Sequence, residues 1–292
     1  MDRFVFLTLD GLSKGAVYAA FALALVLIWR GTRVVNFAQG AMAVATVYVA
    51  YSVSNATDSY WLGFAAAIIA AALLGAVIEV VVARRVHDAP PLNAIVVAIG
   101  LVLLLQAVLG MIYTNEYLAF AAPFSERALT AGGLTLLSPY DLFVFAVVTV
   151  LLVLLTLLFT RTPLGLRMRA SAFAPEVSRL LGVDVARMRT LGWVLAAVVG
   201  SLAGLLVIPT ELGLHPTAMD DIFVAAFTAA VVGGLDSPAG AVIGGLIVGV
   251  LLSYVGGYIR SDATPLAVLA LLVVVLLVRP GGLFAVPQAR RV

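Results

Sequence analysis

The chain has 292 residues, of which 63% are hydrophobic and 11% are charged, and it contains no cysteine. Because soluble domains carry about 25% charged residues, this composition excludes a soluble enzyme, a disordered chain and a collagen-like chain. The missing cysteines exclude disulfides, thiolate catalysis and cysteine-based metal sites, and a net charge of +2 without a basic stripe outside membrane-flanking loops excludes nucleic-acid binding.

Nine apolar runs follow one another along the chain, and most have the length of a helix that crosses the hydrocarbon layer, roughly 17 to 25 residues. The runs do not alternate as membrane-spanning strands would. We therefore predict an all-α, polytopic transmembrane bundle of about 8–10 helices, forming a single domain over residues 1–292. The runs lie at about 11–29, 38–54, 61–83, 92–113, 139–160, 190–210, 218–235, 238–258 and 263–279.

The seventh and eighth runs are short and glycine-rich, and only residues 236–238 separate them. They predict either two spans or one span preceded by a re-entrant piece. The amino-terminal residues lack a basic region followed by a small-residue cleavage site, so we predict no cleaved signal peptide.

Loop charges predict the orientation of the bundle. The connection 161–189 is rich in arginine and therefore should be cytoplasmic. Alternation from this loop places the C-terminus on the cytoplasmic side and the connection 114–138 outside, with the N-terminus outside if all nine runs span. The arginines of the loop are Arg161, Arg167, Arg169, Arg179, Arg187 and Arg189.

The same loop predicts a short amphipathic helix. Pro175 suits the first turn, Gly182 is placed to end the helix in a left-handed cap, and Asp184 can cap the next helix. Such a helix would bind either anionic lipid headgroups at the membrane surface or a partner protein. Its apolar stripe consists of Val177, Leu180 and Leu181.

Glycines four residues apart predict close contacts between helices, either within the chain or in a subunit seam or moving gate. They are Gly200, Gly204, Gly240, Gly244, Gly245 and Gly249.

Four polar side chains inside apolar runs are candidates for a solute pathway, because polar groups at this depth need partners. Asn36 and Gln39 share a helix face, and we favour the alternative that they hold a corner between two helices. Glu79 and Arg84 predict an ion pair at headgroup level. The pathway candidates are Asn36, Gln39, Gln106 and Thr228.

An outer loop gathers Glu211, Asp220 and Asp221 near His215, which predicts either a contact for basic residues of a soluble binding protein or an ordinary solvated loop. The two histidines fall on opposite sides and no HExxH occurs, so we expect no metal site. No G-x-x-x-x-G-K-[ST] motif occurs either, so any ATP and Mg²⁺ should bind a partner chain.

Several segments resemble one family. Glu176 and Gly182 are six apart, as in the Glu-Ala-Ala-x-x-x-Gly coupling loop of ABC importer permeases, with Val177-Ser178 in place of Ala-Ala. The segment Val35-Asn-Phe-Ala-Gln-Gly40 is similar to the Ile-Asn-Phe-Ala-His/Gln-Gly signature of branched-chain amino acid ABC permeases. Residues 11–23, 233–245 and 277–284 also resemble that family, and 161–184 looks like its H-type subunit. Asp236 departs from the family, since it adds a charge to a usually neutral turn.

The resemblance implies a permease subunit, not an enzyme, in the bacterial inner membrane. Its expected partners are an M-type permease, two ABC ATPase subunits and an extracytoplasmic solute-binding protein. The implied cargo is branched-chain amino acids, with urea, short amides or another small solute as alternatives. A secondary transporter or channel is disfavoured, because we find no paired mid-span acids and no clear repeat. The implied coupling residues are Arg167, Arg169, Glu176, Arg179, Leu180, Gly182 and Asp184.

Overall fold

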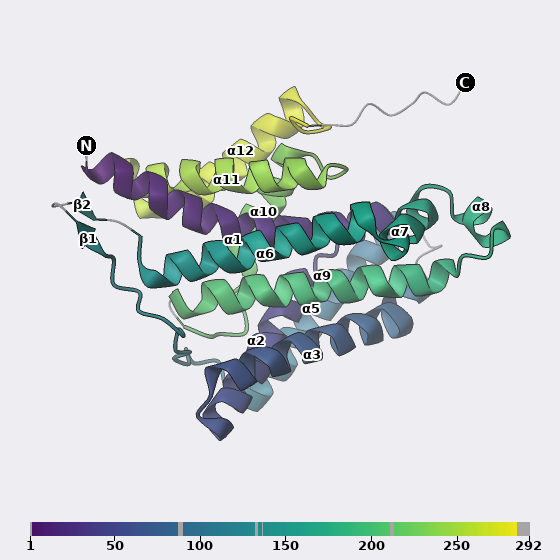
Figure 1. Cartoon of the computed structure of the whole chain (residues 1–292), viewed down its shortest axis with the longest axis horizontal. Helices are drawn as coiled ribbons and strands as arrows, with labels where there is room; N and C mark the ends of the chain where they lie inside the picture. Colours follow the sequence, from purple (N-terminus) through teal and green to yellow (C-terminus); the bar gives the residue numbers. More distant parts are fainter. Residues whose placement is uncertain (1, 87–89, 132–133, 136, 211–212, 285–292) are drawn as a thin grey trace.

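A computed structural model describes residues 2–86, 90–131, 134–135, 137–210 and 213–284. It is a bundle of helices that run along one common direction (Figure 1), which confirms the all-α prediction. A small hairpin, β1 (Thr130–Ala131) and β2 (Leu134–Thr135), lies between α5 and α6. The helices are α1 (Asp2–Thr32), α2 (Gln39–Thr57), α3 (Tyr60–Ile78), α4 (Arg84–Val86), α5 (Pro91–Tyr113), α6 (Pro139–Arg161), α7 (Pro163–Phe173), α8 (Pro175–Leu180), α9 (Val185–Val207), α10 (Asp220–Gly233), α11 (Pro238–Tyr254) and α12 (Thr264–Val278).

Seven helical segments within the described residues are long and apolar enough to cross a membrane. The second and seventh apolar runs form α2 and α10, which are not among the seven. α10 has 14 residues and is about 21 Å long, shorter than the roughly 30 Å hydrocarbon layer. Of the two alternatives for the seventh and eighth runs, the structure therefore fits one spanning helix, α11, preceded by a shorter helix.

The bundle contains two halves with the same internal arrangement, although the sequence shows no clear repeat. α1 packs along α11 as α9 packs along α3, α10 packs on α1 as α2 packs on α9, and α1 and α9 meet at the centre. One half therefore consists of α1, α10 and α11, and the other of α9, α2 and α3. α11 and α3 hold matching places, and each continues into a π-helical turn: η1 (Glu79–Ala83) after α3 and η3 (Val255–Ile259) after α11. α1 runs toward α8, whereas α9 starts beside α8, so the two halves are inverted relative to each other (Figure 1).

The six glycines at four-residue spacing all face helices of this chain. A methyl group added at Gly245 would lie 2.5 Å from the Cα atom of Ala19, and one added at Gly249 would lie 2.3 Å from the Cα atom of Gly15. These contacts let the backbones of α1 and α11 approach closely. Gly200 and Gly204 face α2 in the same way, and Gly240 and Gly244 face α10.

Candidate functional site

The arginine-rich connection folds into two helices, α7 and α8, at the end of the bundle opposite the start of α1 (Figure 1). The sequence analysis missed α7. Its start has a recognisable signal, because the Thr162 hydroxyl accepts a hydrogen bond from the backbone N–H of Gly165 at 3.1 Å and proline follows at the first helical position. Gly165 also permits the sharp turn, since a Cβ there would lie 2.1 Å from the carbonyl oxygen of Leu158.

The predicted ends of α8 are confirmed. Pro175 occupies its first turn, and Gly182 has a φ of +81°, a left-handed conformation that glycine adopts without strain. Asp184 caps α9, because its carboxylate accepts a hydrogen bond from the backbone N–H of Arg187 at 3.0 Å. The same carboxylate pairs with the Arg187 guanidinium at 3.0 Å.

An exposed apolar cluster surrounds α8. We call it the apolar tip of α8 and define it as Phe173, the last residue of α7, together with Val177, Leu180 and Leu181. Leu180 is 88% exposed and Phe173 is 90% exposed. Large exposed apolar side chains at the end of a bundle are typical of a surface that binds another protein or lipid.

A cavity of about 360 Å³ lies beside α8, between the end of α1, α6, α7 and α9. Of the expected coupling residues, Arg169, Glu176 and Arg179 line this cavity. Arg167, Leu180, Gly182 and Asp184 belong to the same connection but do not line it. The remaining charged groups on its wall are Arg30, Arg33 and Arg189, which we group with Arg169 and Arg179 as the arginine cavity.

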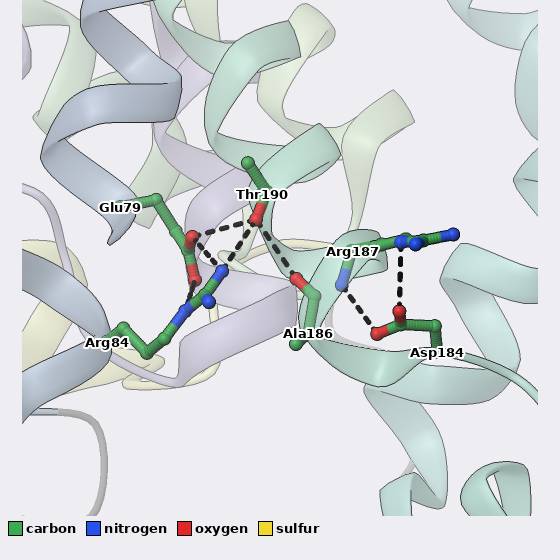
Figure 2. A network of polar contacts seen from close by, with 6 residues as sticks. All are labelled: Glu79, Arg84, Asp184, Ala186, Arg187 and Thr190. Carbon is green, nitrogen blue, oxygen red and sulfur yellow. Dashed lines mark hydrogen bonds and ion pairs between the residues drawn. The ribbon is translucent and has the colours of Figure 1, made fainter. Parts of the chain in front are cut away.

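An ion pair with a buried carboxylate connects to the start of α9 (Figure 2). The Glu79 carboxylate is only 2% exposed and accepts hydrogen bonds from Arg84 Nη2 at 2.8 Å and Nε at 3.3 Å. It also accepts one from the Thr190 hydroxyl at 2.8 Å. The predicted ion pair is therefore confirmed, and through Thr190 it joins the end of α3 to α9.

Asn36 and Gln39 are buried and bond to protein groups. Asn36 Nδ2 donates to Gln39 Oε1 at 3.0 Å, and Asn36 Oδ1 accepts from the backbone N–H of Ala38 at 3.1 Å. Gln39 Nε2 donates to the carbonyl of Ala196, in the middle of α9, at 2.8 Å. The non-helical segment 33–38 therefore enters the bundle, and these side chains hold the corner between α1 and α2.

The four pathway candidates do not meet at one site. Thr228 is buried and donates to the carbonyl of Val224 within its own helix at 2.9 Å. Gln106 Nε2 donates to the carboxylate of Asp220 at 3.1 and 3.2 Å, which joins α5 to α10.

The loops at the end of the bundle away from α8 are tied together around His215. Its ring stacks on Tyr117 with 4.8 Å between the ring centres, and its Nε2 lies 3.1 Å from the carbonyl oxygen of Asn115. Leu118 and Leu214 exchange two backbone hydrogen bonds, at 3.0 and 2.8 Å. Glu211 lies outside the described residues.

The sequence analysis missed a polar patch on the N-terminal half of α1. Lys14 pairs with Asp10 at 3.3 Å, and Ser13 donates to Asp141 on α6 at 2.6 Å. Lys14 and Asp10 line two cavities, of about 260 and 620 Å³, and Asp221 lines the larger one. The signal was available, because Asp10, Ser13 and Lys14 recur at helical spacing within an apolar run.

Segments far apart in the sequence meet near the arginine cavity. The backbone N–H of Leu283 donates to the carbonyl of Val232 at 2.8 Å, so the chain after α12 lies against the end of α10. Asp236, in the following turn, forms an ion pair with Arg33 after α1. The extra charge at Asp236 therefore has a partner in this chain.

Comparison with known proteins gives consistent relatives over nearly the whole chain. LivH of Salmonella typhimurium, a high-affinity branched-chain amino acid transport system permease protein, is 28% identical over 97% of this chain and 96% of its own. BraD of Pseudomonas aeruginosa, described in the same terms, is 27% identical over the same shares. A solved structure of PsaBC from Streptococcus pneumoniae in complex with Fab aligns over 96% of this chain and 91% of that chain, with 14% identity and a TM-score of 0.49.

The sequence pattern of the family described as branched-chain amino acid transport system / permease component matches residues 7–278. That match covers every helix that could span a membrane, in whole or in large part. This chain therefore belongs to the family of branched-chain amino acid transport permease components.

Proposed function

We propose that this chain is an H-type permease subunit of an ATP-driven importer for branched-chain amino acids in the bacterial inner membrane, with its C-terminus in the cytoplasm. The observation that carries the coupling part of the proposal is the apolar tip of α8, which this chain leaves uncovered. A soluble ATPase that buries this tip would gain stability from the apolar area removed from water.

The local structure suits α8 to transmit force. Gly182 and Asp184 form the short turn that connects α8 to α9, and the Glu79 network joins the start of α9 to the end of α3. Because α9 packs against α1 in the centre of the bundle, a displacement of α8 reaches both halves. Two nucleotide states of the ATPase can then favour two arrangements of the same helices.

The other partners follow from the family and from exposed surfaces. α5 and α12 bury only 6% and 11% of their apolar windows inside this chain, which leaves faces for lipid and for an M-type permease. A solute-binding protein would contact the outer loops near His215. ATP and Mg²⁺ would bind two ATPase subunits, and Arg167, Arg169, Glu176 and Arg179 would contact those subunits beside the tip.

For the substrate pathway, the outer cavities around Lys14 and Asp10 are better candidates than the corner of Asn36 and Gln39, which bond to each other. A zwitterionic amino acid needs groups of both signs and an apolar wall, and the larger cavity offers both. Urea and short amides carry no net charges. If the chain transports leucine, Lys14→Gln should therefore impair leucine uptake. If it transports urea or a short amide instead, the same substitution should leave that uptake unchanged. Gln106 and Thr228 remain proposals for deeper contacts.

The coupling proposal can be tested with Leu180→Asp, because Leu180 is so exposed that its replacement leaves the bundle intact. We expect the variant to fold but to lose co-purifying ATPase and ATP-dependent uptake in proteoliposomes. Leu129→Asp is the matched control, since Leu129 is an exposed leucine of the outer connection 114–138. Retained ATPase association by Leu180→Asp, or uptake by this chain alone down an ion gradient, would overturn the proposal.

A further inference from the structure

The arginine cavity concentrates positive charge from four segments. Arg30 and Arg33 come from the end of α1, Arg169 from α7, Arg179 from α8 and Arg189 from α9. A single acidic side chain, Glu176, lies on the described wall of the cavity. Like charges on one wall repel one another, so negative charge bound in this cavity would stabilise the arrangement.

The chain itself supplies little of that charge. Arg33 pairs with Asp236, but within the described residues the side chains of Arg30, Arg169, Arg179 and Arg189 form no ion pair and no hydrogen bond. The Nε atom of Arg189 is buried without a hydrogen-bond partner. A buried donor left unbonded is costly, so an external acceptor is expected there.

The walls indicate what kind of anion fits. Leu27, Phe159 and Trp193 line the cavity together with the arginines, so charged and apolar surfaces face the same space. Its 360 Å³ is about the volume of a dozen liquid water molecules, which exceeds a lone phosphate. Guanidinium groups match the oxygens of phosphate esters in geometry and charge.

We infer that the arginine cavity binds a phosphate ester, whose phosphate pairs with Arg30 and Arg189 and whose remainder lies against the apolar wall. The headgroup of an anionic phospholipid and a soluble phosphate compound both supply this chemistry. A carboxylate of the ATPase is a weaker candidate, because Arg30 and Arg189 belong to membrane-spanning helices and not to the projecting α8. The site does not depend on which solute is transported.

The test uses the full chain in phosphatidylcholine nanodiscs, with or without phosphatidylglycerol. Lipid retained after mild delipidation is measured by native mass spectrometry. In lipid discs without phosphatidylglycerol, binding of radiolabelled inorganic phosphate tests the soluble source. We expect Arg30→Gln/Arg189→Gln to lower retention or phosphate binding about a hundredfold, since two charge-assisted contacts are lost.

Arg85→Gln/Arg161→Gln is the matched control, because both arginines lie near the same end of the bundle but outside the cavity. It should bind as the wild type does. Glu176→Gln removes the acidic group on the wall and should strengthen binding, which keeps the test valid even if the first variant folds poorly. Equal binding by the cavity variant and the control would overturn the inference. So would a cavity variant that loses only ATPase association.

Discussion

The Glu79 pair predicts an unequal response to the removal of its two charges. Arg84→Gln leaves a carboxylate that is 2% exposed with Thr190 as its remaining partner. Removal of one partner from a fully buried ion pair destabilises a protein by about 3–5 kcal/mol, and we expect a smaller loss here because Arg84 is 39% exposed and water can partly take its place. Glu79→Gln instead leaves Arg84, which is 39% exposed and can reach water. The expected loss is then about 1.5–3 kcal/mol, the contribution of hydrogen bonds to a charged group.

The measurement is thermal unfolding of the detergent-solubilised chain, followed by tryptophan fluorescence. Arg84→Gln should lower the Tm more than Glu79→Gln does. The double variant should lose less stability than the sum of the two, because it leaves no unpaired buried charge. Arg187→Gln provides the control from Figure 2: its pair with Asp184 is exposed and should contribute less than about 1 kcal/mol. The reasoning fails if Glu79→Gln is the more damaging change, or if the two losses simply add.

Three further predictions concern the helix contacts. Gly249→Val should abolish a monodisperse peak in size-exclusion chromatography, because its side chain would overlap the backbone of α1, whereas Gly100→Val, which has open space around it, should not. Gln39→Leu removes the oxygen that accepts from the buried Asn36 Nδ2, together with the side-chain donor to the Ala196 carbonyl, and should destabilise the chain by about 1–3 kcal/mol. If the corner is structural, the KM for uptake measured in folded protein stays unchanged, and a raised KM would instead place Gln39 in the pathway. Gly182→Ala forces alanine into a left-handed conformation, which costs about 1 kcal/mol. The variant should therefore bind the ATPase about fivefold more weakly, while its Tm shifts little. Unchanged ATPase association would contradict a rigid link between α8 and α9.

The sequence predicted those features that depend on local chemistry. Spans follow from hydrophobicity, and the ends of α8 follow from Pro175, Gly182 and Asp184, because each residue has one strong conformational or capping preference. The Glu79 ion pair was predictable since its partner lies five residues away.

Features that depend on distant residues were not predictable in this way. The arginine cavity joins Arg30 to Arg189, and no local pattern states that α1 ends beside the start of α9. The inverted halves are hidden because matching helices share packing positions and not residue types. The polar patch at Lys14 was overlooked for a different reason: Lys14 and its partner Asp10 were visible in the sequence, but the nearness of Asp141 on α6 and Asp221 on α10 was not.

The seam between α1 and α11 has a consequence for biosynthesis. α1 leaves the ribosome early, yet the glycines that fit its backbone lie on α11, near the end of the chain. Until α11 is inserted, one side of α1, including Gly15 and Asp10, must stay exposed to lipid or be held by the insertion machinery. A nascent chain that stops before Pro238 should therefore be degraded by membrane quality-control proteases, even though most of its spans have already been made.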